Sequence, residues 1–436
     1  MPPAPGALTL ALTGDSIINM RLSTFSAPGF EDMIHRIRSA DAAFTNFETI
    51  IHNFDIPGAA VSGGTYMGSP PWVTDELKWA GFTLLSVANN HAFDFGPEGM
   101  MSTRRVLAQS GLTFAGSGEN LGIARSPSYV ETKKGRIALI ACASTFTPAS
   151  VAGQQRIDLP GRPGINPLRF TVTYTVDPAT FASLHMLEHL TSPGPDMSVV
   201  SKSGFKFLGA SFKSGDAPAM HTTVNPTDLR EITASVRDAR NQADWVLVSV
   251  HCHEGVAGDR NVPPEFFVAF AHAAIDSGAD LVVGHGPHLV RGVEIYKGRP
   301  IFYSLGDFVF ENETIRFQPT ENYDSVGLPP SALPSEFFTA RSKNDTVSYP
   351  ADREYWEGVY AECSFDALHT LVSVRFHAIE LGFKQPRPQR GRPYPASDAD
   401  AHRIIERLDR LCKPMGTGVR FEDGGGTLVW SPTGQP

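Results

Sequence analysis

The chain has few cysteines, no excess of positive charge and no long apolar run. Only four of its 436 residues are cysteine, and no two of them form a CxxC pair. Cysteines this sparse argue against a disulfide framework and indicate reduced thiols, as in a cytoplasmic protein. The first six residues lack basic charge, and the apolar run after them is too short for a signal peptide or a membrane span. A signal removed from a longer natural chain would leave the same sequence, so that origin stays open.

Positive charge is scarce as well, since the formal net charge is -9. A nucleic acid requires a basic face, so this balance argues against a nucleic-acid partner and against an anionic membrane surface. With 41% hydrophobic and 19% charged residues, the composition is that of a globular protein. The length allows one large domain with insertions or two ordinary domains, and no feature fixes an oligomeric state.

Strand and helix patterns alternate over two parts of the chain. The first part is predicted to carry strands at 7–13, 42–47, 83–88 and 136–143, with helices at 30–40 and 97–110. After an irregular, Pro- and Gly-rich stretch at about 144–225, alternation returns with helices at 227–242 and 265–277 and strands at 245–250, 279–283 and 300–304. A second irregular stretch, 311–351, precedes strands at 358–365 and 372–379 and a helix at 398–411.

Polar side chains follow five of the predicted strands directly. The five clusters are Gly14-Asp15-Ser16, Asn46-Phe47-Glu48, Asn89-Asn90-His91 with Asp94, His251-Cys252-His253-Glu254, and Gly284-His285-Gly286-Pro287-His288. One Asp or His after a strand is more often a helix cap or a satisfied core group. Five in succession are different, because strand ends in an open α/β sheet converge on one crevice. Oxygen and imidazole donors at one point favour a divalent metal such as Mn, Fe or Zn.

In this order the clusters resemble the signature of the calcineurin-like metallophosphoesterases. The chain is similar, more specifically, to the poly-γ-glutamate capsule-biosynthesis (CapA) family, over about residues 8–310. The segments that carry the resemblance are LTGD at 12–15, NFET at 46–49, VANNHAFDFG at 87–96 and GADLVVGHGPHLVRGVEIYKGRPIFYSLGDFVF at 278–310. The resemblance implies an α/β fold of four layers, in which two mixed β-sheets are flanked by helices. It implies one metallophosphoesterase-like domain over 1–312 with the insertion at 144–225, and residues 313–436 packing on the same domain.

The resemblance also implies roles for individual residues. Two divalent metals (Mn, Zn or Fe) are expected, with a mononuclear site as the alternative, and His91 is an outer-shell catalytic group oriented by Asp94. The expected ligands are Asp15, Glu48 as the bridging carboxylate, Asn90, His251, His285 and His288, with His253 as a further ligand or catalytic group. Arg291 is expected to bind a substrate carboxylate or phosphate, or else to form a surface ion pair with Glu294.

Three positions depart from the metallophosphoesterase pattern. Ile17 stands where a histidine is usual, and the closing histidines, His285 and His288, are three residues apart instead of two. Cys252-His253 replaces the Trp-Gly that often follows the strand-end histidine, so His253 is a candidate for an imidazole lost elsewhere. Cys252 is expected to face the core, opposite its neighbours on the strand. Asp307, where Asn is common, is expected to be structural or to support a ligand.

These residues predict a hydrolase in which a metal-bound hydroxide attacks the substrate. The family resemblance favours a small or peptide-like anionic substrate with a γ-glutamyl type amide bond, and the superfamily resemblance keeps a phosphoester as the alternative. A non-catalytic accessory protein of capsule-polymer synthesis is the second alternative, and a Ser or Cys nucleophile finds no supporting motif. The insertion is expected to cover the crevice, with Arg156, Arg162 and Arg169 meeting the substrate's charge, or else to be a solvated loop far from the site.

Overall fold

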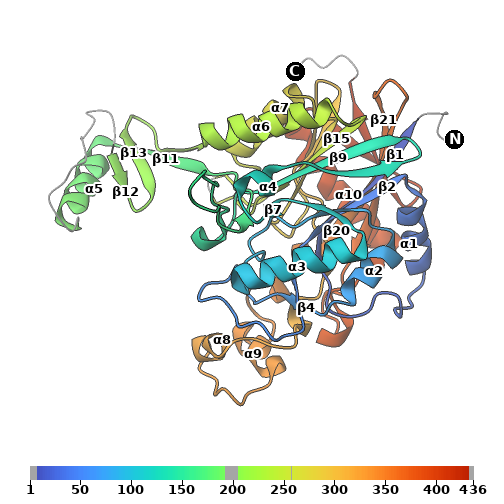
Figure 1. The fold of residues 1–436 in the computed structure, drawn as a ribbon, viewed down its shortest axis with the longest axis horizontal. Helices are drawn as coiled ribbons and strands as arrows, with labels where there is room; N and C mark the ends of the chain where they lie inside the picture. The colour runs from blue at the N-terminus through green and yellow to red at the C-terminus, as the bar shows by residue number, and fades with distance from the viewer. Residues whose placement is uncertain (1–6, 192–204, 257, 432–436) are drawn as a thin grey trace.

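The computed structural model describes residues 7–191, 205–256 and 258–431, and two large mixed β-sheets form its body (Figure 1). The first sheet has the order β23-β24-β21-β20-β1-β2-β5-β6, with β19 beside β1 and β22 beside β21. Its strands are β1 (Leu8–Ile17), β2 (Ala42–Phe47), β5 (Leu84–Ser86), β6 (Thr113–Ala115), β19 (Asp307–Phe310), β20 (Glu357–Phe365), β21 (Leu371–Glu380), β22 (Tyr394–Pro395), β23 (Thr417–Glu422) and β24 (Gly425–Trp430). The strands β1, β2, β5 and β6 are parallel, whereas β20 runs antiparallel to β1.

The second sheet has six strands in the order β17-β18-β16-β15-β9-β8. They are β8 (Ser128–Thr132), β9 (Gly135–Ala143), β15 (Trp245–His251), β16 (Leu281–His285), β17 (Val293–Tyr296) and β18 (Arg299–Phe302). The four inner strands are parallel, and the edge strands β8 and β17 are antiparallel to their neighbours. The inner strands are buried along most of their length, as expected for parallel strands that are covered on both faces.

Helices cover the outer face of each sheet, and apolar side chains fill the spaces between the layers. The first sheet is covered by α1 (Phe30–Ser39), α2 (Val73–Ala80) and α3 (Gly96–Ser110), and the second by α6 (Pro226–Arg240) and α7 (Glu265–Asp276). Leu10, Phe44, Leu139, Leu247 and Leu281 belong to the core between the sheets. The predicted four-layer sandwich is therefore confirmed. The helix α10 (Asp398–Cys412) packs its apolar side against β21, β23 and β24.

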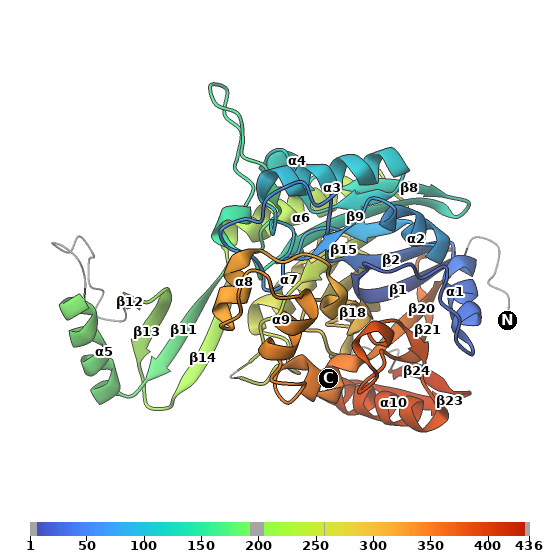
Figure 2. The same cartoon turned by 90° about the horizontal axis from the view of Figure 1, so that it is seen from below.

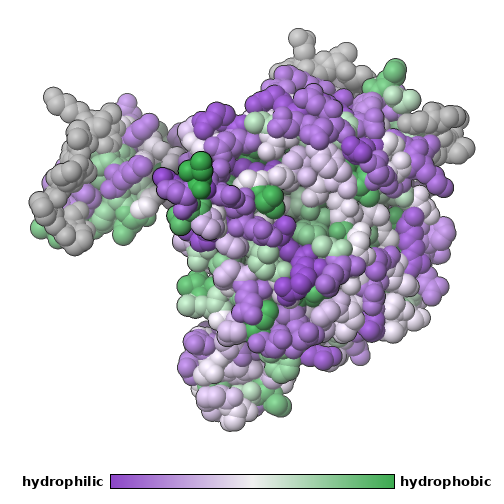
Figure 3. All heavy atoms as spheres, in the orientation of Figure 1, coloured by the Kyte–Doolittle hydropathy of each residue, from purple (hydrophilic) through white to green (hydrophobic). Residues whose placement is uncertain are grey.

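The segment that was expected to be irregular, 144–225, contains regular structure. After the short strand β10 (Gly164–Ile165), which pairs with β7 (Ser117–Gly118), the chain forms β11 (Phe170–Val176), α5 (Pro178–Thr191), β12 (Phe205–Phe207), β13 (Ala210–Ser214) and β14 (Ala219–Val224). These four strands make a separate sheet in the order β12-β13-β11-β14, and with α5 we call them the arm. The arm projects from the body in both views (Figures 1 and 2). On the face shown in Figure 3, hydrophilic residues predominate over the body, and apolar residues gather in patches on the arm.

The remaining elements are short and lie in the loops. They are β3 (Ile50–Ile51), which pairs with β4 (Gly68–Ser69), the helix α4 (Leu121–Arg125), and α8 (Thr320–Ser325) with α9 (Pro334–Arg341) in the second segment that was expected to be irregular. No helix among the described residues is long and apolar enough to span a membrane.

Candidate metal centre

The carboxyl ends of strands from both sheets meet between the two sheets. On the first sheet Asp15 pairs with Asn46 of β2 and with Asp307 of β19, and on the second His251 pairs with His285. The sheets bring these ends together, so that Nδ1 of His285 lies 3.4 Å from Oδ1 of Asp15. The polar strand ends therefore converge on one buried place between the sheets.

Asp15 is fully buried and is held by two hydrogen bonds. Its Oδ1 accepts from the Asn46 amide at 2.7 Å, and its Oδ2 accepts from the Gly286 backbone N–H at 2.8 Å. Gly286 has φ of 112°, and a Cβ there would lie 2.9 Å from the His253 ring, so glycine is required. Burial alone would raise the pKa of Asp15, but the imidazoles of His285, His288 and His251 hold it well below its usual range.

His251 and His285 present ring nitrogens to the same point as Asp15. Their Nδ1 atoms are 3.0 Å apart, and the Ser249 hydroxyl lies 2.7 Å from His285 Nε2. When Nε2–H donates to Ser249, the Nδ1 lone pair of His285 faces Asp15. Burial and the neighbouring imidazoles lower the pKa of His251 well below its usual value, so this ring is neutral, as a metal ligand must be.

Glu48 supplies a buried carboxylate oxygen that lacks a partner among the described residues. This oxygen, Oε1, lies 3.9, 3.8 and 4.0 Å from the Nε2 atoms of His91, His251 and His288. Burial and the charge of Asp15 raise the pKa of Glu48 well above its usual value. Ligand atoms about 2.0–2.2 Å from one ion lie roughly 3–4 Å from one another, so the spacing fits a shared divalent cation. Such a cation would compensate the crowded carboxylates.

His288 stands between Asp15 and Glu48 on a backbone with φ of 57°, a left-handed conformation that histidine adopts only rarely. Its Nδ1 lies 2.8 Å from Oδ1 of Asp307 and 3.8 Å from Oδ2 of Asp15. Burial alone would lower the pKa of His288, but Asp307 and Glu48 raise it well above its usual value. Burial raises the pKa of Asp307 to about 6. Asp307 therefore supports His288 directly.

Asn90 and His253 complete the cluster around His251. The Asn90 Oδ1 lies 2.8 Å from His251 Nε2, and His253 Nε2 lies 2.9 Å from the same nitrogen. Burial lowers the pKa of His253 well below its usual value. Three donor groups in this cluster have ligand atoms within 4.8 Å of one another: Asp15, His251 and His285; Glu48, His253 and His288; and Asp15, His288 and Asp307. All seven residues predicted to be ligands thus lie in one connected cluster.

His91 lies beside the cluster with its ring fixed by a carboxylate. Nδ1 of His91 is 2.7 Å from Oδ2 of Asp94, which also accepts from the backbone N–H of Met67 at 2.8 Å. The other oxygen of Asp94 accepts from the Gly63 N–H at 2.9 Å. When Nδ1–H donates to Asp94, Nε2 of His91 is left facing the centre, where it can hold or take a proton.

The structure places Arg291 differently from the sequence-based expectation. Its guanidinium is buried, and it donates to the backbone carbonyls of Arg260, Cys252, His253 and Glu254 at 2.8–3.3 Å. Because the backbone carbonyls occupy its guanidinium, Arg291 is not placed to bind a substrate. It does not pair with Glu294, which instead accepts from the Tyr303 hydroxyl. Arg291 holds the loop that carries His253, a role hidden in the sequence because its acceptors are main-chain atoms.

Three further positions that the sequence singled out lie near the cluster. The carboxylate of Glu254 accepts from Ser144 at 2.7 Å and from Thr145 at 3.0 Å, so it is a structural group. Cys252 is buried in the core beneath α6 and α7, as expected, and burial raises the pKa of its thiol. Ile17 is buried in the core under α1 and α2.

The three arginines of the insertion also have local partners. Arg156 pairs with Asp158 at 2.8 Å, Arg169 pairs with Asp228 at 2.7 Å, and Arg162 donates to the Val151 carbonyl. Each of them therefore has a local partner, and their contact with a substrate stays a prediction.

Sequence reasoning missed Ser249 and gave Asn46 no role of its own. Both lie two residues before a residue of the cluster, His251 and Glu48 respectively. Because alternate residues of a strand share a face, this spacing is the signal that could have identified them.

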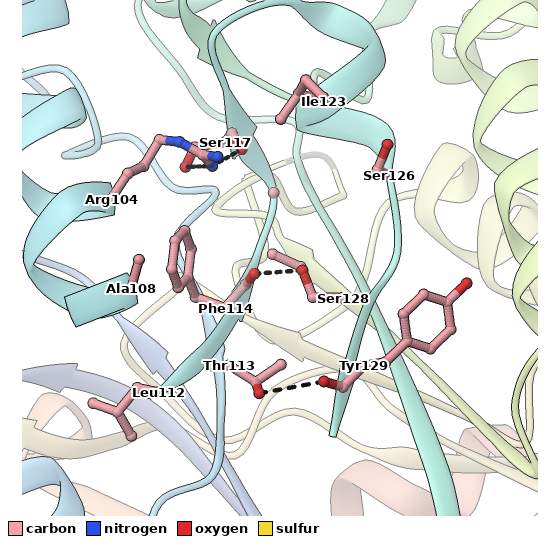
Figure 4. Close-up of a pocket in the computed structure, with 12 residues that line it drawn as sticks. Arg104, Ala108, Leu112, Thr113, Phe114, Ser117, Ile123, Ser126, Ser128 and Tyr129 are labelled. Atoms are coloured by element: carbon pink, nitrogen blue, oxygen red, sulfur yellow. Dashed lines mark hydrogen bonds between the residues drawn. The ribbon is translucent and has the colours of Figure 1, made fainter. Parts of the chain in front are cut away.

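Two further features lie away from the cluster. On α5 of the arm, His185, Glu188 and His189 bring three possible ligand atoms within 4.8 Å of one another. A cavity of about 360 Å³ lies between α3 and the strands β6 to β8 (Figure 4). Its polar groups are engaged locally, since Ser128 donates to the Phe114 carbonyl at 2.6 Å, and no acidic residue or histidine lines it.

Comparison with known proteins identifies the family. The family model described as "Bacterial capsule synthesis protein PGA_cap" matches residues 9–312. The chain belongs to the PGA_cap family. The match contains every residue of the cluster, and the predicted membership is confirmed.

The relatives of this PGA_cap chain differ in sequence identity and in the fraction of the chain that they match. An uncharacterized protein, y4sH, of Sinorhizobium fredii is 35% identical over 433 residues, which is 96% of this chain and 92% of that protein. The capsule biosynthesis protein CapA of Bacillus anthracis is 24% identical over 310 residues, 70% of this chain and 60% of that protein. A probable polyglutamine synthesis accessory protein of Mycobacterium tuberculosis is 28% identical over 233 residues, 53% of this chain and 46% of that protein.

Proposed function

We propose that the chain is a metal-dependent hydrolase that cleaves a γ-glutamyl type amide bond in a carboxylate-bearing substrate. The observation that carries the proposal is the buried Oε1 of Glu48. This oxygen has no hydrogen-bond partner among the described residues and faces three imidazole nitrogens at 3.8–4.0 Å. A buried carboxylate without a hydrogen bond is costly unless a cation completes its surroundings. Supporting it, Asp15 with His251 and His285 forms an adjacent donor group.

We infer two ions at this centre. Asp15, His251 and His285 would hold one ion, and Glu48, His253 and His288 would hold the other, with Asn90 beside His251 as a further donor. The oxygen and imidazole donors suit Mn, Fe or Zn. When bound, such ions lower the pKa of a coordinated water and polarise the electrophilic group of the substrate.

Residues of the chain then fix the orientation of the histidine rings and transfer protons. Asp94 fixes the His91 ring through Nδ1, so that Nε2 can protonate a leaving amine. Ser249 and Asp307 fix the rings of His285 and His288 in the same way. His253 is held by Thr145, which accepts from its backbone N–H at 2.9 Å, and its half-buried ring serves as a ligand or as a base.

The choice of bond rests on the relatives. A relative from Bacillus subtilis, 28% identical over 236 residues, is named PGA biosynthesis protein CapA. That name favours a glutamyl polymer or its fragments over a phosphoester, which stays the alternative substrate because the superfamily resemblance points to it.

A non-catalytic role is the second candidate, and the name of the Mycobacterium tuberculosis relative, an accessory protein of polyglutamine synthesis, favours it. An accessory protein that only organises other components does not need to retain stoichiometric metal or to lose function on chelation. Metal dependence therefore separates the two candidates.

The experiment has two parts. Elemental analysis of the purified chain measures metal content, and we expect close to two ions per chain. The metal-loaded chain is then incubated with γ-glutamyl oligomers and with aryl phosphates, and released amines and phosphate are measured. Cleavage of the oligomers that stops on chelation and returns with metal supports the hydrolase. Stoichiometric metal with cleavage of neither substrate class contradicts it.

A further inference from the structure

A second cavity, which we call the arginine pocket, is lined by three arginines. It measures about 470 Å³, and its walls include Arg21, Arg316, Arg392, Trp72, Thr24 and Thr314. None of the residues that line it is acidic. The chain has a formal net charge of -9, yet the three guanidinium groups make the charge around this cavity positive.

Neighbouring carboxylates neutralise only part of the positive charge of the arginine pocket. Arg21 pairs with the buried Glu76 at 2.8 Å, and its guanidinium stacks on Trp72 at 4.6 Å. Arg392 lies 3.6 Å from Oε1 of Glu311, which is beyond hydrogen-bonding distance. Arg316 is exposed and makes no hydrogen bond or ion pair with any residue that the structure describes. At least one guanidinium is therefore free to bind an anion.

The pocket lies next to the metal centre along the same strands. The paired strands β1 and β19 carry Asp15 opposite Asp307, and Ile17 pairs with Phe310 where they end. Just beyond, the backbone N–H groups of Asn19 and Met20 donate to the Glu311 carboxylate, both at 2.7 Å. Asn19 and Met20 line the pocket. Asn19 comes four residues after Asp15, so even in an extended chain their Cα atoms are at most about 13 Å apart.

We propose that the arginine pocket binds a carboxylate of the substrate next to the bond held at the metal centre. This rests on the proposed function, since it assumes an acidic chain that crosses the centre. The planar guanidinium group of arginine binds carboxylates and phosphates alike, so the ligand of the pocket is expected to present a small oxyanion group. A chain with a carboxylate on every residue would place one group at the pocket and a neighbouring bond at the metals.

The test uses the full chain loaded with its divalent metal. Calorimetric titrations compare a γ-linked glutamate oligomer, the same oligomer with its α-carboxylates amidated, and inorganic phosphate. The charged oligomer is expected to bind, and the amidated one about tenfold more weakly. Arg316→Ala should weaken binding of the charged oligomer roughly fivefold, the scale of one charge-assisted contact near the surface. Arg105→Ala, an exposed arginine on α3 outside the pocket, is the matched control and should change nothing.

Each contrary result has a defined meaning. Unchanged oligomer binding by Arg316→Ala overturns the pocket assignment. Phosphate binding that depends on Arg316, without oligomer binding, makes the pocket a phosphate site and overturns the substrate assignment. Oligomer binding that depends on Arg316, without any cleavage, supports the pocket and contradicts the hydrolase. Cleavage with a KM that does not respond to Arg316→Ala supports the hydrolase and overturns the pocket.

Discussion

Individual side chains in the centre depend on a partner that holds each ring in place. The Ser249 hydroxyl lies 2.7 Å from Nε2 of His285, and when Nε2–H donates to it the Nδ1 lone pair faces Asp15. Ser249→Ala should lower metal affinity about 10- to 100-fold, the usual effect of losing such a supporting contact. Metal retained during a chelator titration measures this. Ser86→Ala is the control, because the buried Ser86 hydroxyl on β5 has no described partner. Equal metal loss in both variants would contradict the role of Ser249.

His91 differs from the ligands in its expected response to mutation. Because Asp94 fixes its Nδ1, the ring is suited to proton transfer, and His91→Ala should lower turnover by about 100-fold or more. Metal content, measured by elemental analysis, should stay close to that of the parent chain. Metal lost in parallel with activity would make His91 a ligand and contradict this assignment.

The position of a site residue could be predicted from the sequence where strand periodicity applies to it. Asp15, Glu48 and His251 directly end or follow apolar strands, so their place at the crevice could be predicted. The main-chain partners of Arg291 and the left-handed backbone of His288 have no such pattern. They depend on tertiary packing, which a local pattern does not contain.

Among the elements, the loop 251–254 depends most on a single residue. Arg291 donates to three of its carbonyls and to that of Arg260. Arg291→Met leaves buried carbonyls without donors, so unfolding free energy should fall by about 3 kcal/mol. Urea unfolding measures it, and Arg105→Met on the exposed face of α3 is the control. A variant as stable as the parent would show that the loop is held by other contacts.

The elements also show what local patterns can and cannot predict. The strand predicted at 42–47 is β2 to the residue, because it is apolar and bounded by Asp41 and the polar cluster. In the arm, β11 alternates apolar residues with threonine, so this strand was predictable from its pattern and was missed, whereas the half-buried β14 has no regular alternation. The hairpin β23–β24 was also missed, since its glycines lower the local strand propensity.

At the scale of the whole molecule, the centre exists only because two sheets face each other. Asp15 and Glu48 come from the first sheet or the loop that follows it, and His251, His285 and His288 come from the second. The order of the clusters along the chain predicts convergence but not which imidazole meets which carboxylate. The family resemblance predicted the sandwich, whereas the pairing of β19 with β1, which brings Asp307 to His288, required the structure.

The arm should be removable without loss of the metal centre. Its strands β11 and β14 pair Thr173 with His221, so an Asn-Gly turn replacing residues 174–220 would close a hairpin between neighbouring residues. Phe170, which stacks on Phe266 with ring centroids 4.2 Å apart, remains as the anchor to the body. Tm by calorimetry should change by a few degrees at most, and metal content should be unchanged. Adding Phe170→Ala to the shortened chain should destabilise it by about 2 kcal/mol. Loss of metal on shortening would show that the arm supports the centre, whereas unchanged metal with slower cleavage of long oligomers alone would assign it to substrate recognition.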